Sequence, residues 1–197
     1  MKNNILNYGL ILMAICSITV AALAFINLKT KPVIEQQKIR ETQNAVMAVM
    51  PRGTAQIEPV LNEQGQTLYY IGRAVDSTCV GYAIECRGKG YAPDSIQTLL
   101  GVDTNMIVTG ARVIAQKETP GLGDKISAIG TYQGEKKIWI TQFNTLTYSQ
   151  ILLKKDNPQD GTIDALTGAT ITSRGVTLSV VTGLKRLEQY LHKELTP

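Results

Sequence analysis

Residues 164–173 read Asp164-Ala165-Leu166-Thr167-Gly168-Ala169-Thr170-Ile171-Thr172-Ser173, with four hydroxyl side chains around one glycine. Behind them, from residue 176 to residue 195, apolar residues recur at helical spacing, which predicts a C-terminal helix. Thr172 and Ser173 are residue types that cap a helix start, because a side-chain oxygen accepts a free backbone N–H there. A helix start also favours a phosphate group, since free N–H donors and the positive end of the helix dipole meet there. Taken alone, the segment favours an ordinary loop and helix cap, because hydroxyl-rich caps are common.

A second segment, residues 117–125, reads Lys117-Glu118-Thr119-Pro120-Gly121-Leu122-Gly123-Asp124-Lys125. The Pro-Gly pair predicts a turn. Gly121 and Gly123 allow the backbone to lie close to a flat ligand, because glycine carries no side chain. The plain alternative is a solvated connection between two strands.

Together the two segments resemble one family. The pattern Asp-x-x-Thr-Gly-Ala-Thr, followed by Thr-Ser and a helix, is similar to the attachment motif of the FMN-binding domains in Rnf complexes and in the Na⁺-translocating NADH:quinone reductase. Residues 118–123 are similar to the Glu-Thr-Pro-Gly-Leu-Gly loop of the G subunit of the Rnf complexes, and the similarity runs from about residue 72 to the C-terminal helix. In that family the last threonine of the Gly-Ala-Thr step is esterified to the FMN phosphate, and the matching residue is Thr170.

The resemblance implies a membrane-anchored electron-transfer subunit with covalent FMN, a phosphoprotein, in an Rnf-type complex that couples ferredoxin and NAD to ion translocation. FMN carries the redox chemistry, so the chain is expected to act as the redox subunit of a translocase and not as a catalyst alone. No catalytic residue and no metal ligand is expected. The implied partners are the other membrane subunits and a flavin transferase that attaches FMN. The expected cofactor-binding residues are Thr170, Asp164, Leu166, Thr167, Gly168, Ala169 and Thr172 in the first segment, and Glu118, Thr119, Gly121, Leu122 and Gly123 in the second.

Two other functions compete with this interpretation. The C subunit of the Na⁺-translocating NADH:quinone reductase shares the Thr170-type motif, although the short chain and the complete loop at residues 118–123 favour the Rnf complex. A non-redox, membrane-anchored sensor or interaction domain is the third possibility. The chain has no Gly-x-Gly-x-x-Gly fingerprint, so we expect nicotinamide sites on partner subunits.

The N-terminal region predicts a single membrane anchor. Residues 3–28 contain no charged side chain, and about 20 apolar residues suffice to cross a bilayer core. The alternative is a cleaved signal peptide, because residues 21–24, Ala-Ala-Leu-Ala, resemble a cleavage site. The lysines and arginine at positions 29, 31, 38 and 40 would hold the domain in the cytoplasm by the positive-inside rule. The family resemblance implies the opposite, with the flavin domain on the extracytoplasmic side of the cytoplasmic membrane, and we follow it.

Beyond the anchor, residues 1–28, we expect a juxtamembrane helix or stalk over residues 29–57 and one FMN-binding domain over residues 58–197. Pro32 predicts an interruption, and residues 33–50 an amphipathic helix that either faces a partner or packs on its own domain. Aromatic and β-branched content predicts strands at residues 67–75, 80–86, 106–114 and 137–140, and short helices are expected at residues 95–100 and 149–154. The order of elements indicates an α+β fold, an antiparallel or mixed sheet with flanking helices.

Composition excludes other classes. The net charge is only +4, from 20 basic against 16 acidic residues without a basic block, so no nucleic-acid partner is expected. A single histidine, His192, excludes a histidine-rich metal site. Cys79 and Cys86 flank a strand-like segment, and an extended chain would hold them too far apart for a disulfide. Free thiols are therefore predicted, and an iron–sulfur site would need cysteines from another subunit.

Overall fold

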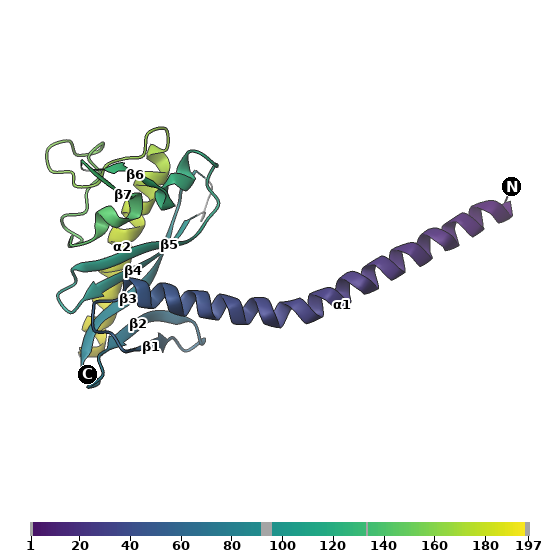
Figure 1. Cartoon of the computed structure of the whole chain (residues 1–197), viewed down its shortest axis with the longest axis horizontal. Coiled ribbons are helices and arrows are strands. Elements are labelled where there is room, and N and C mark those ends of the chain that lie inside the picture. Colours follow the sequence, from purple (N-terminus) through teal and green to yellow (C-terminus); the bar gives the residue numbers. More distant parts are fainter. Residues whose placement is uncertain (1, 92–95, 133, 196–197) are drawn as a thin grey trace. The chain divides into compact units, whose positions relative to one another are not determined.

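The computed structural model describes residues 2–91, 96–132 and 134–195 (Figure 1). The chain forms two compact units, Met1–Thr42 and Gln43–Pro197. One long N-terminal helix is followed by a sheet and a C-terminal helix, which confirms the predicted α+β class.

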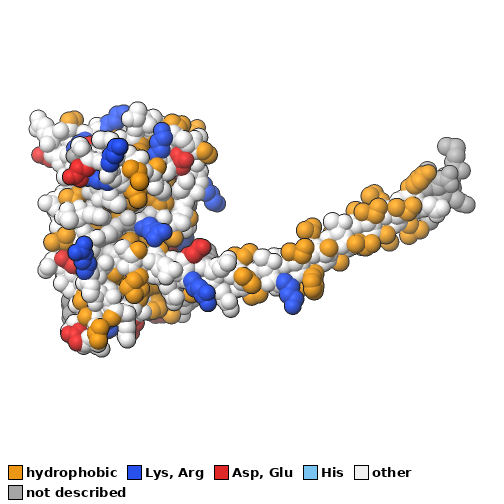
Figure 2. Space-filling model, in the orientation of Figure 1, with side chains coloured by type: hydrophobic (Ala, Val, Ile, Leu, Met, Phe, Trp, Pro, Cys, Tyr) orange, Lys and Arg blue, Asp and Glu red, His pale blue; other side chains and the backbone are white. Residues whose placement is uncertain are grey.

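Helix α1 runs without a break from Lys2 to Val49. The interruption predicted at Pro32 is wrong, because this proline lies inside the helix. A proline removes one backbone hydrogen bond from a helix, and in a helix of 48 residues the neighbouring bonds persist on both sides. Among the described residues, α1 is the one helix that is long and apolar enough to cross a membrane. Figure 2 shows hydrophobic side chains, without charged neighbours, along its N-terminal part.

The sheet is an antiparallel meander of five strands in sequence order. Its strands are β1 (Gln56–Leu61), β2 (Thr67–Arg73), β3 (Cys79–Gly88), β4 (Ile96–Asp103) and β5 (Val108–Gln116). Along the chain, the sheet is followed by a short 3-10 helix, η1 (Gly123–Ser127), and a hairpin of β6 (Ile129–Tyr132) and β7 (Glu135–Ile138). A second 3-10 helix, η2 (Trp139–Phe143), and helix α2 (Thr170–Leu195) complete the domain. The long connection between η2 and α2 carries the first of the two motif segments.

The two short helices predicted inside the domain are wrong. From Ile96 onward the segment expected as a helix is strand β4, and Ser95 lies outside the described residues. This strand is covered on both faces, so Leu99 and Leu100 are both buried and the alternation that marks a half-exposed strand is missing. Residues 149–154 form a turn and an isolated bridge from Leu153 to Ile163. There the carbonyl of Thr147 accepts a hydrogen bond from the backbone N–H of Gln150, which closes the turn.

Strand β1 was not predicted, because its sequence contains Glu58 and Pro59. It is an edge strand with exposed or half-buried residues throughout, and proline is tolerated at a sheet edge where its missing N–H faces solvent.

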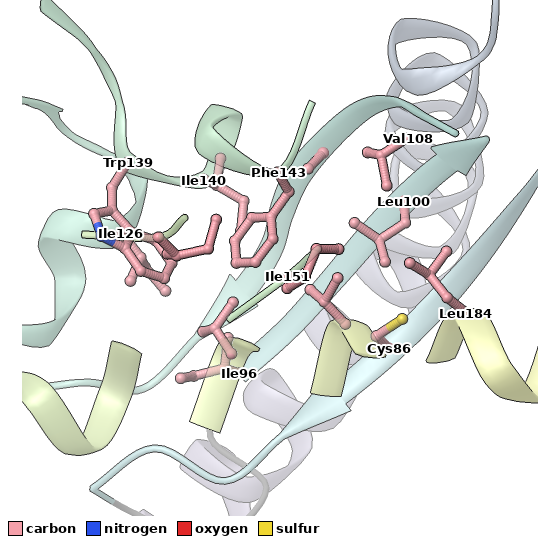
Figure 3. Close-up of a cluster of buried hydrophobic side chains, with 14 of the residues drawn as sticks. Cys86, Ile96, Leu100, Val108, Ile126, Trp139, Ile140, Phe143, Ile151 and Leu184 are labelled. Carbon is pink, nitrogen blue, oxygen red and sulfur yellow. The ribbon is translucent and has the colours of Figure 1, made fainter. Parts of the chain in front are cut away.

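Two hydrophobic clusters cover the two faces of the sheet. The larger one packs α2 against the sheet through Val176, Val180, Leu184 and Leu187, and it includes Trp139 and Phe143 of η2. Figure 3 shows Leu100, Cys86 and Leu184 converging in this cluster beside Ile140 and Ile151. The smaller cluster packs the last turns of α1, Ala45 to Met50, against Ala83 and Leu99. The amphipathic segment therefore packs on its own domain at this end, while Ile34 and Ile39 farther up α1 are exposed.

Cys79 and Cys86 are free thiols, as predicted, and so is Cys16. Cys86 lies in the core, where burial raises the pKa of its thiol to about 12. The buried thiol stays protonated at neutral pH and acts as a small apolar side chain.

Four glycines, one on each of strands β2 to β5, lie close to neighbouring chain, and two of them, Gly101 and Gly110, contact the end of α1. This glycine row comprises Gly72, Gly81, Gly101 and Gly110, in which Gly72 pairs with Gly81 and Gly101 with Gly110. A Cβ atom on Gly101 would lie 1.9 Å from the carbonyl oxygen of Val49, and one on Gly110 would lie 2.7 Å from Val49 Cα. The same carbonyl oxygen accepts a hydrogen bond of 2.8 Å from Thr109 Oγ1. The helix end therefore lies directly on the sheet backbone.

We expect Gly101→Ala to lower the free energy of unfolding of the full chain by about 1–3 kcal/mol, because the added methyl group collides with backbone that has no room to move. Chemical denaturation in detergent measures the change. Ala115→Val enlarges an exposed side chain of β5 and should change the free energy of unfolding by less than about 0.5 kcal/mol. Equal stability of Gly101→Ala and the wild type would contradict the close packing.

Candidate functional site

Both motif segments line one cavity of about 620 Å³ in the domain. This volume lies in the range of cofactor pockets in proteins, about 300–1,000 Å³. Residues from the second segment, from the first segment and from α2 enclose it together with one tyrosine and one lysine. They are Glu118, Thr119, Leu122 and Gly123, then Gly168, Ala169, Thr170, Ile171 and Thr172, then Tyr91 and Lys155.

Glu118 joins the two segments. Its Oε2 accepts a hydrogen bond of 2.5 Å from Thr172 Oγ1, across 54 positions of sequence, and one of 3.2 Å from the backbone N–H of Tyr91. The side chain is only 7% exposed. Two glycines make room for it, because a Cβ on Gly90 would lie 2.2 Å from Glu118 Oε1 and one on Gly123 would lie 2.7 Å from Oε2. The carboxylate thus fixes the distance between the two loops.

Helix α2 begins at Thr170, earlier than the capping residues predicted from the sequence. Thr172 and Ser173 lie inside its first turn and do not cap it: Thr172 donates to Glu118, and the Ser173 hydroxyl accepts from the backbone N–H of Leu166 at 2.8 Å while donating to the carbonyl of Ala169. The residue before the helix is Ala169, whose methyl group offers no oxygen to the first N–H groups. The first turn of α2 lines the cavity through Thr170, Ile171 and Thr172.

Thr170 meets a cation that the sequence did not indicate. Lys155 Nζ donates a hydrogen bond of 3.2 Å to Thr170 Oγ1. Lys155 belongs to the loop between Leu153 and Ile163, which form a bridge and hold the two ends of this loop together. No periodicity or motif marks the residue, because its position depends on that loop closing in three dimensions.

Asp164 supports the first segment from outside the cavity. Its carboxylate pairs with Lys154 at 2.7 Å, its carbonyl accepts a hydrogen bond of 2.6 Å from Trp139 Nε1, and its N–H donates one of 2.9 Å to Gln142 Oε1. Trp139 and Gln142 are buried residues of η2, so the core itself anchors the start of the motif. Neither residue was expected near the site, because Trp139 lay in the strand predicted at residues 137–140 and Gln142 came just after it.

The remaining predicted residues divide between core and surface. Leu166 is buried in the large cluster and anchors the loop below the cavity. Thr167 and Gly121 are exposed and are not among the residues that line the cavity. Gly121 and Gly168 have φ angles of 79° and 80°, a conformation that glycine adopts without strain. Both shape their turns.

The composition of the cavity fits a flavin mononucleotide. One side offers a hydroxyl, an ammonium and the first turn of α2, the groups that bind a phosphate. Leu122, Ile171 and Tyr91 supply apolar surface that suits an aromatic ring system, and Leu122 and Ile171 are 44% and 55% exposed. In the described part of the chain, no group of three or more His, Cys, Asp or Glu side chains is placed to hold a metal ion.

Two known families match different parts of the chain. A family described as "FMN-binding domain" matches residues 90–185, which include both motif segments and most of α2. A second, described as "RnfG N-terminal region", matches residues 1–49, the extent of α1.

Similar proteins align along nearly the whole chain. The G subunit of the Na(+)-translocating ferredoxin:NAD(+) oxidoreductase complex of Acetobacterium woodii is 30% identical over 189 residues, 87% of this chain and 86% of the relative. The G subunit of the ion-translocating oxidoreductase complex of Salmonella typhimurium is 31% identical over 207 residues, 96% of this chain and 92% of the relative. That of Shewanella baltica is 30% identical, covering 91% and 88%. These matches decide for the Rnf family over the quinone reductase. The chain belongs to the family of G subunits of ion-translocating oxidoreductase complexes and contains an FMN-binding domain.

Proposed function

We propose that this chain is the membrane-anchored electron-transfer subunit of an Rnf-type complex, with FMN joined by a phosphoester to Thr170, and that the complex couples electron transfer between ferredoxin and NAD to ion translocation. The relative from Acetobacterium woodii is named for that reaction. The chain is a single-pass membrane protein of a complex with other subunits. We assign anchoring to residues 1–28, the stalk to residues 29–57 and FMN binding to residues 58–197.

One observation supports the proposal above the others: residues 118–123 and 168–172, distant in sequence, line a single cavity. A solvated connection and a capped loop, the plain alternatives, would not be expected to meet. A non-redox sensor domain would not need the hydrogen bond between Glu118 and Thr172, which holds the two segments beside one cavity.

Bound FMN supplies the capacity to exchange one or two electrons. In this proposal the chain's own residues attach and orient it. Thr170 presents its hydroxyl at the first turn of α2, where backbone N–H groups and the helix dipole favour a phosphate. Leu122 and Ile171 would cover apolar surface of the ring, and Gly123 leaves room for the Glu118 carboxylate and the Thr172 hydroxyl at the cavity wall.

We propose that a separate flavin transferase forms the phosphoester at Thr170, as the family resemblance implies. The ester would make the chain a phosphoprotein and would prevent loss of FMN from an open cavity. We also propose that the flavin domain lies on the extracytoplasmic side, as the family resemblance implies.

Thr170→Ala should abolish covalent flavin completely when the chain is produced together with a flavin transferase, because it removes the accepting oxygen. Fluorescence of the denatured protein under ultraviolet light measures covalent flavin. Thr131→Ala is the matched control, since it removes an exposed hydroxyl of β6, outside both motif segments, and should leave the fluorescence unchanged. Flavin retained on the Thr170→Ala chain would refute the attachment site.

Glu118→Gln should keep covalent FMN and raise its reduction potential. A carboxylate on the cavity wall disfavours the negative charge of reduced flavin, and its low exposure strengthens the repulsion. We expect a rise on the order of 30–60 mV, where about 59 mV per electron corresponds to about 1.4 kcal/mol. Redox titration provides the measurement, with Glu135→Gln on exposed β7 as the control. Equal potentials for wild type and Glu118→Gln would place the carboxylate away from the ring.

C-terminal fusions test the side of the membrane. We expect a reporter that works only outside the cytoplasm, such as alkaline phosphatase, to be active at this position, because the family resemblance implies an extracytoplasmic domain although the basic residues after the span favour the cytoplasmic side. A fluorescent protein that matures only in the cytoplasm serves as the opposite arm and should be inactive. Activity of the cytoplasmic reporter alone would reverse the assigned orientation.

A further inference from the structure

Three consecutive residues before the first motif segment each contact a different part of it or of α2. Lys154 pairs with Asp164 at 2.7 Å, and Lys155 donates to the Thr170 hydroxyl at 3.2 Å. Asp156 accepts from Arg174 Nε at 2.7 Å. The three contacts span the segment from its first residue to the second turn of α2. The loop that carries them, residues 151–163, therefore frames the attachment segment.

The backbone of this loop is fixed. Lys154 N–H donates to the carbonyl of Ile163 at 2.9 Å, and Asp156 N–H donates to the carbonyl of Leu153 at 3.0 Å. Leu153 and Ile163 are buried, as is Ile151. The side chain of Lys155 is exposed, but the backbone that carries it is held in place at the edge of the cavity.

The charged residues on either side of Lys155 form ion pairs with other residues. Asp156, the adjacent carboxylate, is engaged by Arg174, and this hydrogen bond lowers the pKa of Asp156 below its usual value. Lys154 is engaged by Asp164. The ammonium of Lys155 is the cationic side chain that lines the cavity, and its hydrogen bond is made to the hydroxyl that we assign as the attachment point.

We propose that Lys155 is a positioning residue for the flavin phosphate: its ammonium orients the Thr170 hydroxyl, pairs with the phosphoryl oxygens during attachment, and remains paired with the phosphodiester afterwards. This inference rests on the proposed attachment of FMN at Thr170. An ammonium donates hydrogen bonds and accepts none, so Lys155 acts through charge and orientation and not as a base.

The attachment step requires such a charge. The Thr170 oxygen forms a bond to the phosphorus of an activated flavin phosphoanhydride, supplied with the transferase. The phosphoanhydride bond breaks, the leaving phosphate departs with the electron pair, and the hydroxyl proton passes to solvent. Negative charge is concentrated on the non-bridging oxygens of the phosphorus, and transfer of this kind depends mainly on positioning and electrostatic stabilisation. These oxygens form two bonds away from Thr170 Oγ1, within reach of the Lys155 ammonium.

The test compares rates of attachment in the full-length chain after production of a flavin transferase is started. Intact mass gives the fraction of chains that carry covalent flavin over time. We expect Lys155→Met to slow attachment roughly five- to tenfold, the range for one partly exposed charge-assisted contact. Lys155→Arg should restore most of the rate, since it keeps the charge. Lys136→Met, which removes an exposed lysine from β7, is the control and should match the wild type.

A second measurement follows the finished product. In chains that are fully loaded after long expression, the ³¹P resonance of the phosphodiester should shift in Lys155→Met and in Lys155→Gln, but not in Lys136→Met. A role in folding alone would not move it. Wild-type rates together with an unshifted resonance would overturn the role of Lys155 while leaving Thr170 as the attachment site. Absence of covalent flavin on the wild-type chain would overturn the proposed function, and this inference with it.

Discussion

The hydrogen bond between Thr172 and Glu118 is the contact on which the site depends. It joins the first turn of α2 to the loop after β5 at 2.5 Å, and Tyr91 N–H adds a third segment to the same carboxylate oxygen. Burying a carboxylate costs free energy unless hydrogen bonds satisfy it. Because Glu118 is buried, losing either donor would be costly, and this cost holds the three segments together. Gly90 and Gly123 are part of this arrangement, because any side chain on either would displace the carboxylate.

The attachment segment is braced by neighbours of opposite character. On its inner side Trp139 and Gln142 bind the backbone of Asp164, and Leu166 is embedded in the core. On its outer side, exposed ion pairs connect it to the preceding loop. Exposed ion pairs contribute little to stability, about 0–1 kcal/mol each, so the inner contacts hold the segment and the outer ones set charge near Thr170. The buried contacts therefore stabilise the segment, and the exposed ion pairs affect the charge around it.

The fold class, strands β2, β3 and β5 and helix α2 were predictable from local patterns, because alternation and helical spacing report burial on one face. The strand predicted at residues 137–140 was right only for residues 137–138 of β7, because Trp139 and Ile140 begin the 3-10 helix η2. The pattern failed where burial is not one-sided. Strand β4 is covered by helices on both faces and has no alternation, while β1 at the edge has too little burial to produce one. In the site, the sequence motifs identify residues that share a cavity, including Glu118 and Thr170. Lys155 and Trp139 were beyond reach, since each acts through a contact set by the tertiary fold.

The meander has a consequence for the order in which the molecule is made. Strands β1 to β5 pair only with neighbours in sequence, so each pairing closes a short loop, and such topologies assemble early as a chain leaves the ribosome. The segment with the proposed attachment residue Thr170 comes after all of them, and the helix that it begins, α2, packs on β3 and β4. An unfinished chain therefore presents a threonine without its helix, its glutamate contact or its lysine. If FMN is attached as we propose, a flavin transferase would meet the complete acceptor site only on a finished domain.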